Sequence, residues 1–515
     1  MIPRWRLILS KLFLIPQRYV LGIMGLLAVC NAYTMRVCLN LAVTQMVKSS
    51  GNSSEHYDPN ACPDDSEIIA NGTVSSKPHA IFDWSESTQG LILSGFYYGY
   101  AVTHIPGGYL AERYGGKWTL GVGLLSTAVF TLLTPVVVKA GGATWLFILR
   151  VLQGMGEGPT MPALMIVLAR WVPPHERGRQ GAIVFGGAQI GNIFGSFMSG
   201  FLMAGDGDWA NVFYFFGIFG IIWFVFWTDT ARMDTFYSLL CYSTPNTHPY
   251  ISEEELKYLK EHVTSSEKSS IRDPVPWKAI VRSVPVWALL FAAVGHDWGY
   301  YTMVTDLPKY MTDVLKFNIA ATGTLTAIPY LAMWISSFIF GLVCDYCVKK
   351  NWHTIKTGRI IHTTIAATGP AICIILASYA GCDRLAAVAY FIASMALMGG
   401  FYSGMKVNAL DLAPNYAGSL TAMINGTSTI SGIITPYLIG LLTPDSTLAE
   451  WRVAFWVCFA VLVGTNVVYI IWADGKQQWW DDVRQYGYPD DWKHGPLSKS
   501  DTDKEKSKKA EATSF

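Results

Sequence analysis

Three polar residues with helical spacing lie in one of the most apolar stretches of the chain. Arg150, Gln153 and Glu157 fall in the first half of residues 147–179, which is apolar enough to cross a bilayer. At about 100° per residue, positions three and seven apart lie on nearly one face of an α-helix. A charge at mid-bilayer depth costs at least about 2.5–3.5 kcal/mol, so this face is expected to contact protein or a water-filled cavity.

This polar stripe has two readings. A buried Arg–Glu pair can do no more than lock two helices together, or it can line the pathway of an ion or substrate. We favour the pathway, because a guanidinium stays charged and binds carboxylate or phosphate in a bidentate way. We expect Glu157 to neutralise Arg150 in the empty state and to exchange that role when a substrate or a proton arrives.

A second polar face occurs in the first apolar run, residues 19–43, where Tyr33, Arg36 and Asn40 are three and four positions apart. Arg36 lies too deep for a simple interfacial anchor, although snorkelling to the headgroups is an alternative. Two arginines near one cavity would form an electropositive trap for an anion. We therefore expect these three residues, together with Arg150, to bind the substrate.

Two histidines are candidates for proton coupling. His104 lies in the second apolar run, and His296 is followed by Asp297 in the seventh. An unperturbed histidine titrates near physiological pH, but a lone intramembrane histidine can equally be a hydrogen-bonded packing residue. We expect coupling to involve Glu157 with these three residues, and we add Tyr301 to the substrate contacts, although it could simply pack.

The composition indicates an all-α polytopic membrane protein. Hydrophobic residues make up 51% of the 515 residues and charged residues only 15%, against about 25% in soluble domains. Apolar runs of about 20 residues recur along the chain, the length that spans a bilayer. The net charge of +1 gives no bulk field for nucleic acid, and the nine cysteines lack zinc-like spacing, so we expect no nucleic-acid partner, no metal and no cofactor.

The apolar runs divide the chain into two halves of six expected spans each. The basic N-terminus and the lysine- and arginine-rich loops are expected to be cytosolic, as is the C-terminal tail. Residues 408–418 are expected to form a loop before the eleventh span, and Glu253–His262 a short helix begun by Ser252. The expected order is a cytosolic N-terminus (1–18), an N-terminal six-helix bundle (19–228), a central cytosolic loop (229–282), a C-terminal six-helix bundle (283–473) and a cytosolic disordered tail (474–515).

The loop at residues 44–87 is expected to lie outside the cytosol. It is rich in acids, has only two lysines, and carries glycosylation sequons at Asn52 and Asn71. Cys62 in this loop and Cys382 are both expected on the non-cytosolic side, where a disulfide between them is allowed but not required by the sequence.

A short charged and glycine-rich turn, Gly108–Lys117, follows the second apolar run. It resembles the loop signature G-x-L-x-D-R-x-G-G-K of the major facilitator superfamily, with glutamate in place of the aspartate. Gly341–Asp345 repeats its glycine-to-acid spacing in the second half, which suggests an internal duplication. The expected conformational switch consists of Gly108, Glu112, Arg113, Gly116, Lys117 and Asp345.

Further motifs resemble one branch of that superfamily, the anion/cation symporter family, which includes type I sodium–phosphate cotransporters, sialin and vesicular glutamate transporters. They are Arg36–Asn40, Thr103–Tyr109, Arg150–Gly158 and Trp171–Arg177, within a resemblance that extends over residues 18–474. The resemblance implies a major facilitator fold of two six-helix bundles, alternating access, anion recognition by the arginines of spans one and four, and coupling through the glutamate of span four.

The substrate is less strongly indicated. Vesicular glutamate transporters carry an arginine where this chain has His296 and a histidine where it has Leu93, whereas His296–Tyr301 and Leu307–Tyr310 resemble the phosphate-cotransporter branch. We expect sodium-coupled symport of inorganic phosphate. The alternatives are proton- or voltage-coupled transport of an organic anion such as glutamate, sialate or urate, or an anion channel or receptor.

No nucleophile motif or phosphate-cradling loop supports an enzyme. We expect a monomer in a lipid bilayer, with sodium or a proton as the coupling ion. The tail shows no obvious dileucine-type sorting signal, which favours the plasma membrane over a vesicular or lysosomal membrane.

Overall fold

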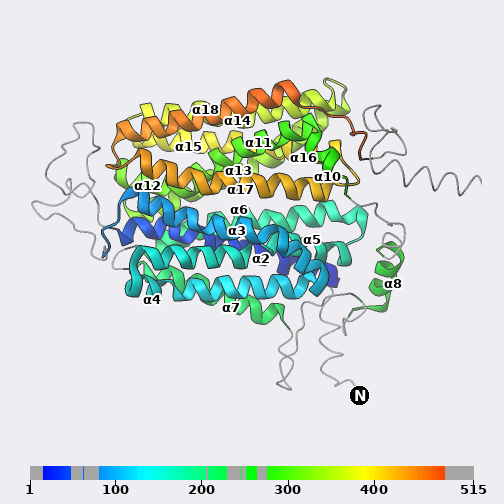
Figure 1. Ribbon diagram of the computed structural model, residues 1–515, viewed down its shortest axis with the longest axis horizontal. Helices are drawn as coiled ribbons and strands as arrows, with labels where there is room; N and C mark the ends of the chain where they lie inside the picture. The colour runs from blue at the N-terminus through cyan, green and yellow to red at the C-terminus, as the bar shows by residue number, and fades with distance from the viewer. Residues whose placement is uncertain are drawn as a thin grey trace, which may run out of the picture.

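The computed structural model describes residues 16–47, 62, 81–204, 207–228, 245, 251–263 and 275–481. These residues are helical almost throughout, and the β-structure among them is an isolated bridge between Val47 and Phe82. Two bundles of roughly parallel and antiparallel helices lie against each other, with the first half of the chain below the second in Figure 1.

The N-terminal bundle has six membrane-length segments. Gly142 takes a positive φ of 63° and bends α4, so this element contains both the third span and the start of the fourth. Pro159 then separates α4 from the rest of the fourth span, α5. The helices are α2 (Gln17–Met46), α3 (Glu86–Tyr114), α4 (Gly116–Glu157), α5 (Thr160–Trp171), α6 (Pro174–Leu202) and α7 (Ala210–Trp227).

The C-terminal bundle repeats the arrangement with more interruptions. Its first span continues from α11 through two π-helical turns, and its fourth consists of α15, a 3-10 turn and α16. The elements are α10 (Trp277–Arg282), α11 (Val284–Tyr301), η3 (Thr302–Asp306), α12 (Leu307–Lys309), η4 (Tyr310–Val314), α13 (Ile319–Lys349), α14 (Ile355–Tyr379), α15 (Arg384–Met398), η5 (Gly399–Phe401), α16 (Met405–Leu412), α17 (Ala417–Leu442) and α18 (Leu448–Trp472).

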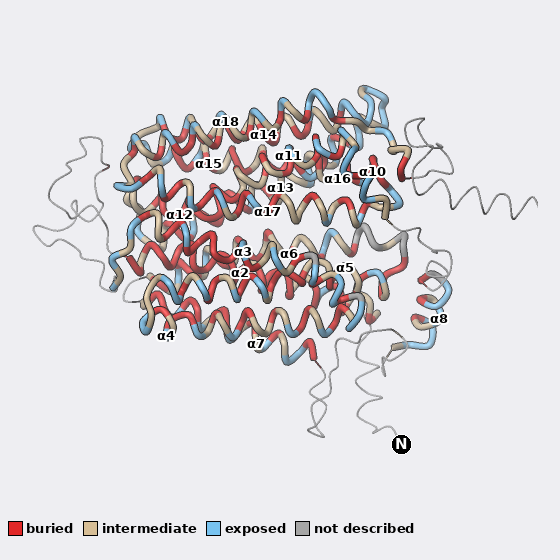
Figure 2. The backbone as a smooth tube through the Cα atoms, in the orientation of Figure 1, coloured by how far each residue is buried: buried red, intermediate tan, exposed pale blue. Residues whose placement is uncertain are grey.

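The most apolar spans are recognisable from length and composition alone. Eight helical stretches of the described residues are long and apolar enough to cross a membrane, and one of them, residues 116–171, contains two spans. The spans built on α3, α11 and α17 are not among them. These three helices meet where the bundles face each other, since α17 packs against both α3 and α11. Figure 2 shows buried backbone concentrated along this inner region and exposed positions on the outer faces.

Two expectations about the connecting segments have opposite outcomes. Helix α8 spans Glu253–His262 as predicted, and the Ser252 hydroxyl accepts a hydrogen bond from the Glu255 amide at its start. The loop expected at residues 408–418 is wrong, because α16 continues to Leu412.

Hydrogen bonds to other helices explain why residues 408–412 are helical. The Asn408 amide donates to the Tyr469 hydroxyl at 2.8 Å, and the Asp411 carboxylate accepts from Arg359 Nε at 2.7 Å. The Asn408 amide nitrogen and the Asp411 carboxylate, which indicated a loop, therefore have partners inside the bundle, and only the few residues around Pro414 connect α16 to α17.

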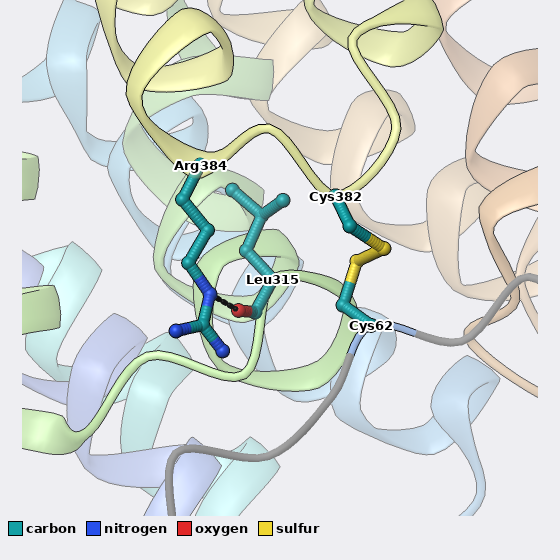
Figure 3. Close-up of a disulfide and its surroundings, with 4 residues drawn as sticks. All are labelled: Cys62, Leu315, Cys382 and Arg384. Carbon is teal, nitrogen blue, oxygen red and sulfur yellow. Dashed lines mark hydrogen bonds between the residues drawn. A yellow bond between two sulfur atoms is a disulfide. The ribbon is translucent and has the colours of Figure 1, made fainter.

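A disulfide joins Cys62, in the long loop of the N-terminal half, to Cys382, between α14 and α15 of the C-terminal half, with a Cα–Cα distance of 5.3 Å. Beside it, Arg384 Nε donates to the Leu315 carbonyl at 2.8 Å (Figure 3). The bond crosses from one bundle to the other. We call the end of the molecule that carries it the disulfide end, and the opposite end, where α8 lies, the α8 end (Figure 1).

The bundles are held closely together at the disulfide end. Glu86 at the start of α3 forms a buried ion pair with Lys309 of α12. Gly200 of α6 and Gly323 of α13 lie backbone against backbone, so that a Cβ on either would meet the other chain segment. These contacts join the two halves directly, in addition to the disulfide.

The packing of α3 on α17 loosens toward the α8 end. Near the disulfide end, a Cβ on Gly90 would clash with the backbone of Pro436. At mid-depth, a Cβ on Gly426 would lie 3.9 Å from His104, and near the α8 end one on Gly418 would meet no atom within 4 Å. Contact along this helix pair therefore tightens toward the disulfide end.

Candidate functional site

The centre of the N-terminal bundle holds a buried ion pair between Arg36 of α2 and Glu157 at the end of α4. The two residues are 6% and 1% exposed, so neither charge is solvated by bulk water. The second carboxylate oxygen of Glu157 and the Nε of Arg36 have no hydrogen-bond partner among the described residues. Buried polar atoms normally have a partner, so this pair retains unused capacity for a proton, an ion or a substrate atom.

Arg150 lies beside this pair without bonding to Glu157. Its Nη2 donates to the backbone carbonyl of Arg36 at 3.2 Å, and its Nη1 donates to Gln153 Oε1 at 3.2 Å. The Gln153 amide is held in turn by the hydroxyls of Thr131 and Thr134.

Sequence spacing thus placed Arg150, Gln153 and Glu157 on one face correctly, but the carboxylate neutralises Arg36 instead of Arg150. The reason is the tertiary packing of the helices, which the sequence spacing does not show. Arg36 comes from another helix, α2, and its guanidinium reaches the Glu157 carboxylate directly, whereas Arg150 is oriented by Gln153 and by a backbone carbonyl.

Aromatic rings enclose the Arg36 guanidinium. Its carbon lies 4.4 Å from the Tyr33 ring centroid, 4.8 Å from Phe96 and 5.0 Å from Tyr100. Ring faces attract cations, and most strongly where water is excluded. These rings therefore help to stabilise a charge inside the bundle, and Tyr33, expected to contact substrate, contacts the arginine itself.

The remaining predicted substrate residues bridge the two halves. Asn40 Nδ2 donates to the Val304 carbonyl of η3 at 2.8 Å. Tyr301 packs edge to face on Tyr97 of α3, with 4.6 Å between centroids. Nearby, Asn192 donates to the Tyr300 hydroxyl at 2.7 Å. The structure thus brings Asn40 and Tyr301 to the interface between the bundles, close to mid-depth.

The two histidines occupy different environments. His104 Nδ1 lies 3.1 Å from the Gly158 carbonyl, next to Glu157 in the chain, and its ring packs on Tyr100. His296 stacks face to face on Phe401 at 3.5 Å. It also lines a small cavity with residues of α11, α14, η5 and α18, namely Ala292, Thr363, Ala366, Ala367, Phe401, Thr465 and Asn466. His104 therefore belongs to the Arg36 region, whereas His296 faces the interior of its own bundle.

Asp297 has a neighbour that the sequence analysis did not single out. The Asp297 carboxylate interacts electrostatically with the ammonium of Lys406 on α16. Lys406 Nζ donates to Asn425 Oδ1 of α17 at 2.8 Å. A lone lysine inside an expected membrane span is itself a functional signal, and it could have been recognised from the sequence.

The expected conformational switch lies at the α8 end. Gly116 requires the absence of a side chain, because a Cβ there would clash with the Ala163 backbone. Arg113 is exposed, with its Nη1 3.2 Å from the Tyr109 hydroxyl.

The other switch residues differ in their exposure. Lys117 is buried at 3%, and its carbonyl accepts from Trp227 Nε1 at 2.9 Å. Asp345 is exposed. Gly108 lies on α3 facing Pro162, and the side chain of Glu112 is outside the described residues.

Two further expectations concern residues that the structure does not describe or ions that it does not contain. Asn52 and Asn71, the expected glycosylation sites, lie outside the described residues. Within the described part of the chain, no group of three or more His, Cys, Asp or Glu side chains is arranged to hold a metal ion.

Comparison with known proteins relates this architecture to one superfamily. The sequence pattern of the Major Facilitator Superfamily matches residues 25–436. A Drosophila ananassae protein named "Putative inorganic phosphate cotransporter" is 37% identical over 463 residues, covering 88% of this chain and 92% of its own. Human sialin is 37% identical over 466 residues, covering 90% of each chain. Human vesicular glutamate transporter 2 is 31% identical over 476 residues, covering 92% of this chain and 77% of its own.

The fold comparison agrees. The xylose transporter XylE of E. coli, in a partially occluded inward-open conformation, superposes with a TM-score of 0.61 at 13% identity, covering 88% of this chain and 98% of that chain. The all-α fold of two six-helix bundles is thereby confirmed. Since the superfamily pattern covers most of the chain and the relatives match nearly all of it, this protein belongs to the Major Facilitator Superfamily and is a multi-pass membrane transporter, not an enzyme.

Proposed function

We propose that the protein is a secondary active transporter that moves a small anion by alternating access, with inorganic phosphate as the first candidate and sodium as the coupling ion. The observation that carries this proposal is the placement of Arg36, Arg150 and Glu157 together inside the N-terminal bundle, with hydrogen-bonding capacity left unused. Two guanidinium groups attract an anion, and an adjacent carboxylate can respond to its arrival.

The relatives support an anion as the cargo. Their names refer to inorganic phosphate, to sialin and to glutamate. A proton- or voltage-coupled organic anion transporter is the second candidate, and it is favoured by His104, whose ring lies at the Gly158 carbonyl within reach of the Arg36 aromatic cluster.

The direction of the molecule in the membrane follows from the disulfide. Disulfides persist in oxidising compartments, so we place the disulfide end on the non-cytosolic side and both termini in the cytosol. The close contacts at the disulfide end then correspond to a state closed to the outside, and alternating access requires those contacts to separate. We place the protein in the plasma membrane as a monomer, with a vesicular or lysosomal membrane as the alternative.

The test is uptake of radiolabelled phosphate into proteoliposomes, with and without an inward sodium gradient, beside Arg150→Ala. Sodium-driven phosphate uptake that is lost in Arg150→Ala would support both phosphate as the substrate and Arg150 as part of its binding site. Uptake of labelled glutamate, sialate or urate driven by a proton gradient or voltage, with no phosphate uptake, would overturn the phosphate proposal and support the second candidate. Fluxes that never exceed equilibrium would contradict a coupled carrier altogether.

A further inference from the structure

Lys406 is a cation inside the C-terminal bundle that is not part of the proposed anion site at Arg36 and Arg150. It lies on α16, and its Nζ is held by Asn425 Oδ1 at 2.8 Å and lies 5.7 Å from the Phe401 ring centroid. A charged lysine inside a membrane span is costly and marks a substrate or ion pathway more often than a packing position. It is half-buried, whereas Arg36 and Arg150 are almost fully buried.

Asp297 carries the carboxylate that interacts electrostatically with this lysine. The two charges interact electrostatically, yet both residues are described and they form no ion pair within 4 Å. Asp297 also interacts electrostatically with Tyr301 and, across the bundle interface, with Tyr33. The carboxylate therefore lies within electrostatic range of both the Lys406 ammonium and Tyr33, whose ring packs on Arg36.

The position of these two charges repeats that of the first pair. Counting spans within each half, Arg36 is on the first and Glu157 on the fourth; Asp297 is likewise on the first span of its half and Lys406 on the fourth. Each bundle thus joins a cation and a carboxylate from its first and fourth spans, with the order of the charges exchanged. In the duplicated architecture, equivalent spans approach the interface from opposite sides.

We propose that Lys406 is a further substrate-contacting residue, and that the substrate is a small anion with at least two acceptor groups, one held by the arginines of the N-terminal bundle and one by Lys406. This inference rests on the proposed anion transport. In the empty state Asn425 accepts a hydrogen bond from the ammonium and Asp297 attracts it from a distance, and an arriving anionic group replaces Asn425. Phosphate and a dicarboxylate share this chemistry.

The experiment compares Lys406→Gln with wild type for uptake of labelled phosphate and, in a second arm, labelled glutamate. We expect the KM of the transported anion to rise about tenfold or more, because a hydrogen bond to a charged group is lost. Lys406→Arg should remain within about threefold of wild type. The control is Lys350→Gln, which removes the same charge from an exposed position beside Tyr346.

Competition by unlabelled anions gives a second readout. Succinate should compete with the tracer much better than butyrate in wild type, and Lys406→Gln should lose most of this preference for the second charge. Arg36 variants, in contrast, should weaken competition by both. If Lys406→Gln is poorly expressed, Asn425→Ala tests the same ammonium by removing the hydrogen-bond acceptor that the anion has to displace, and a fall in KM is expected. A KM unchanged from wild type would contradict the exchange.

The outcomes separate this inference from the proposed function. An unchanged KM and an unchanged preference for succinate in Lys406→Gln, with uptake still lost in Arg150→Ala, would overturn the role of Lys406 alone. A wild-type protein that carries neither phosphate nor glutamate, nor any tested anion, would overturn anion transport itself. The phosphate and glutamate arms decide which of the two cargoes the site takes.

Discussion

Each of the two bundles combines a cation and a carboxylate from its first and fourth spans, but the two pairs differ in burial and in contact. In the N-terminal bundle, Arg36 and Glu157 are in direct contact, almost completely buried and surrounded by aromatic rings. In the C-terminal bundle, Asp297 and Lys406 are half-buried and interact without contact. A tight buried pair resists being broken, whereas two charges that interact without contact can exchange partners more readily. From this difference we expect the Arg36–Glu157 pair to control coupling, and Lys406 to exchange partners when the substrate binds.

The largest expected effect comes from breaking the tight pair. Arg36→Gln leaves the Glu157 carboxylate buried without its cation, which should destabilise the protein by about 3–5 kcal/mol and abolish uptake. Thermal unfolding of the purified protein in detergent measures the first effect, and proteoliposome uptake the second.

The double variant Arg36→Gln, Glu157→Gln distinguishes a structural lock from a pathway. Both charges are then absent, so we expect much of the stability to return while uptake stays absent. Recovery of both properties would show that the pair only holds the helices together. The equivalent change in the loose pair, Asp297→Asn, should have little effect on thermal stability.

A smaller effect is expected from the covalent link at the disulfide end. Replacing Cys62 and Cys382 by serine should lower the free energy of unfolding by about 2–4 kcal/mol, the typical contribution of a disulfide. Because the two thiols act as one bond, each single variant should be as destabilised as the double variant. Additive losses in the two single variants would contradict the bond, as would separation of the wild-type protein into two fragments on a non-reducing gel after cleavage between the halves.

The smallest effect tests the gradient of packing between α3 and α17. Gly90→Ala places a Cβ against the Pro436 backbone, which should cost about 1–3 kcal/mol and shift the protein away from the state closed at the disulfide end. Gly418→Ala, at an exposed position of α17 with no atom within 4 Å, is the control on the same helix and should be nearly neutral. Modification of an engineered cysteine near residue 319 by a membrane-impermeant thiol reagent would report the shift. Equal labelling of both variants would contradict the gradient.

The sequence predicted what depends on local periodicity and failed where tertiary partners decide. The common face of Arg150, Gln153 and Glu157 follows from helical geometry, and the division of residues 116–171 follows from Gly142. The ion-pair partner of Glu157 could not be predicted, because the sequence around Glu157 does not show which arginine of another helix approaches it.

The C-terminal bundle was harder to predict for the same reason. Its first and fourth spans are interrupted by π-helical and 3-10 turns. Asn408 and Asp411 of α16 form hydrogen bonds with Tyr469 and Arg359, which are distant in the chain. Lys406 lies within an expected span, and the free-energy cost of a charged lysine in a bilayer was the sequence signal that could have identified it as a functional residue.

The most direct test of the account is the behaviour of Glu157→Gln in proteoliposomes, measured as concentrative uptake and as tracer exchange of the same labelled anion. If Glu157 couples transport to the driving ion, the variant should retain exchange between labelled and unlabelled anion while losing accumulation against a gradient, together with its dependence on sodium or pH. Accumulation with unchanged sodium and pH dependence would contradict the central claim and leave the Arg36–Glu157 pair a structural lock.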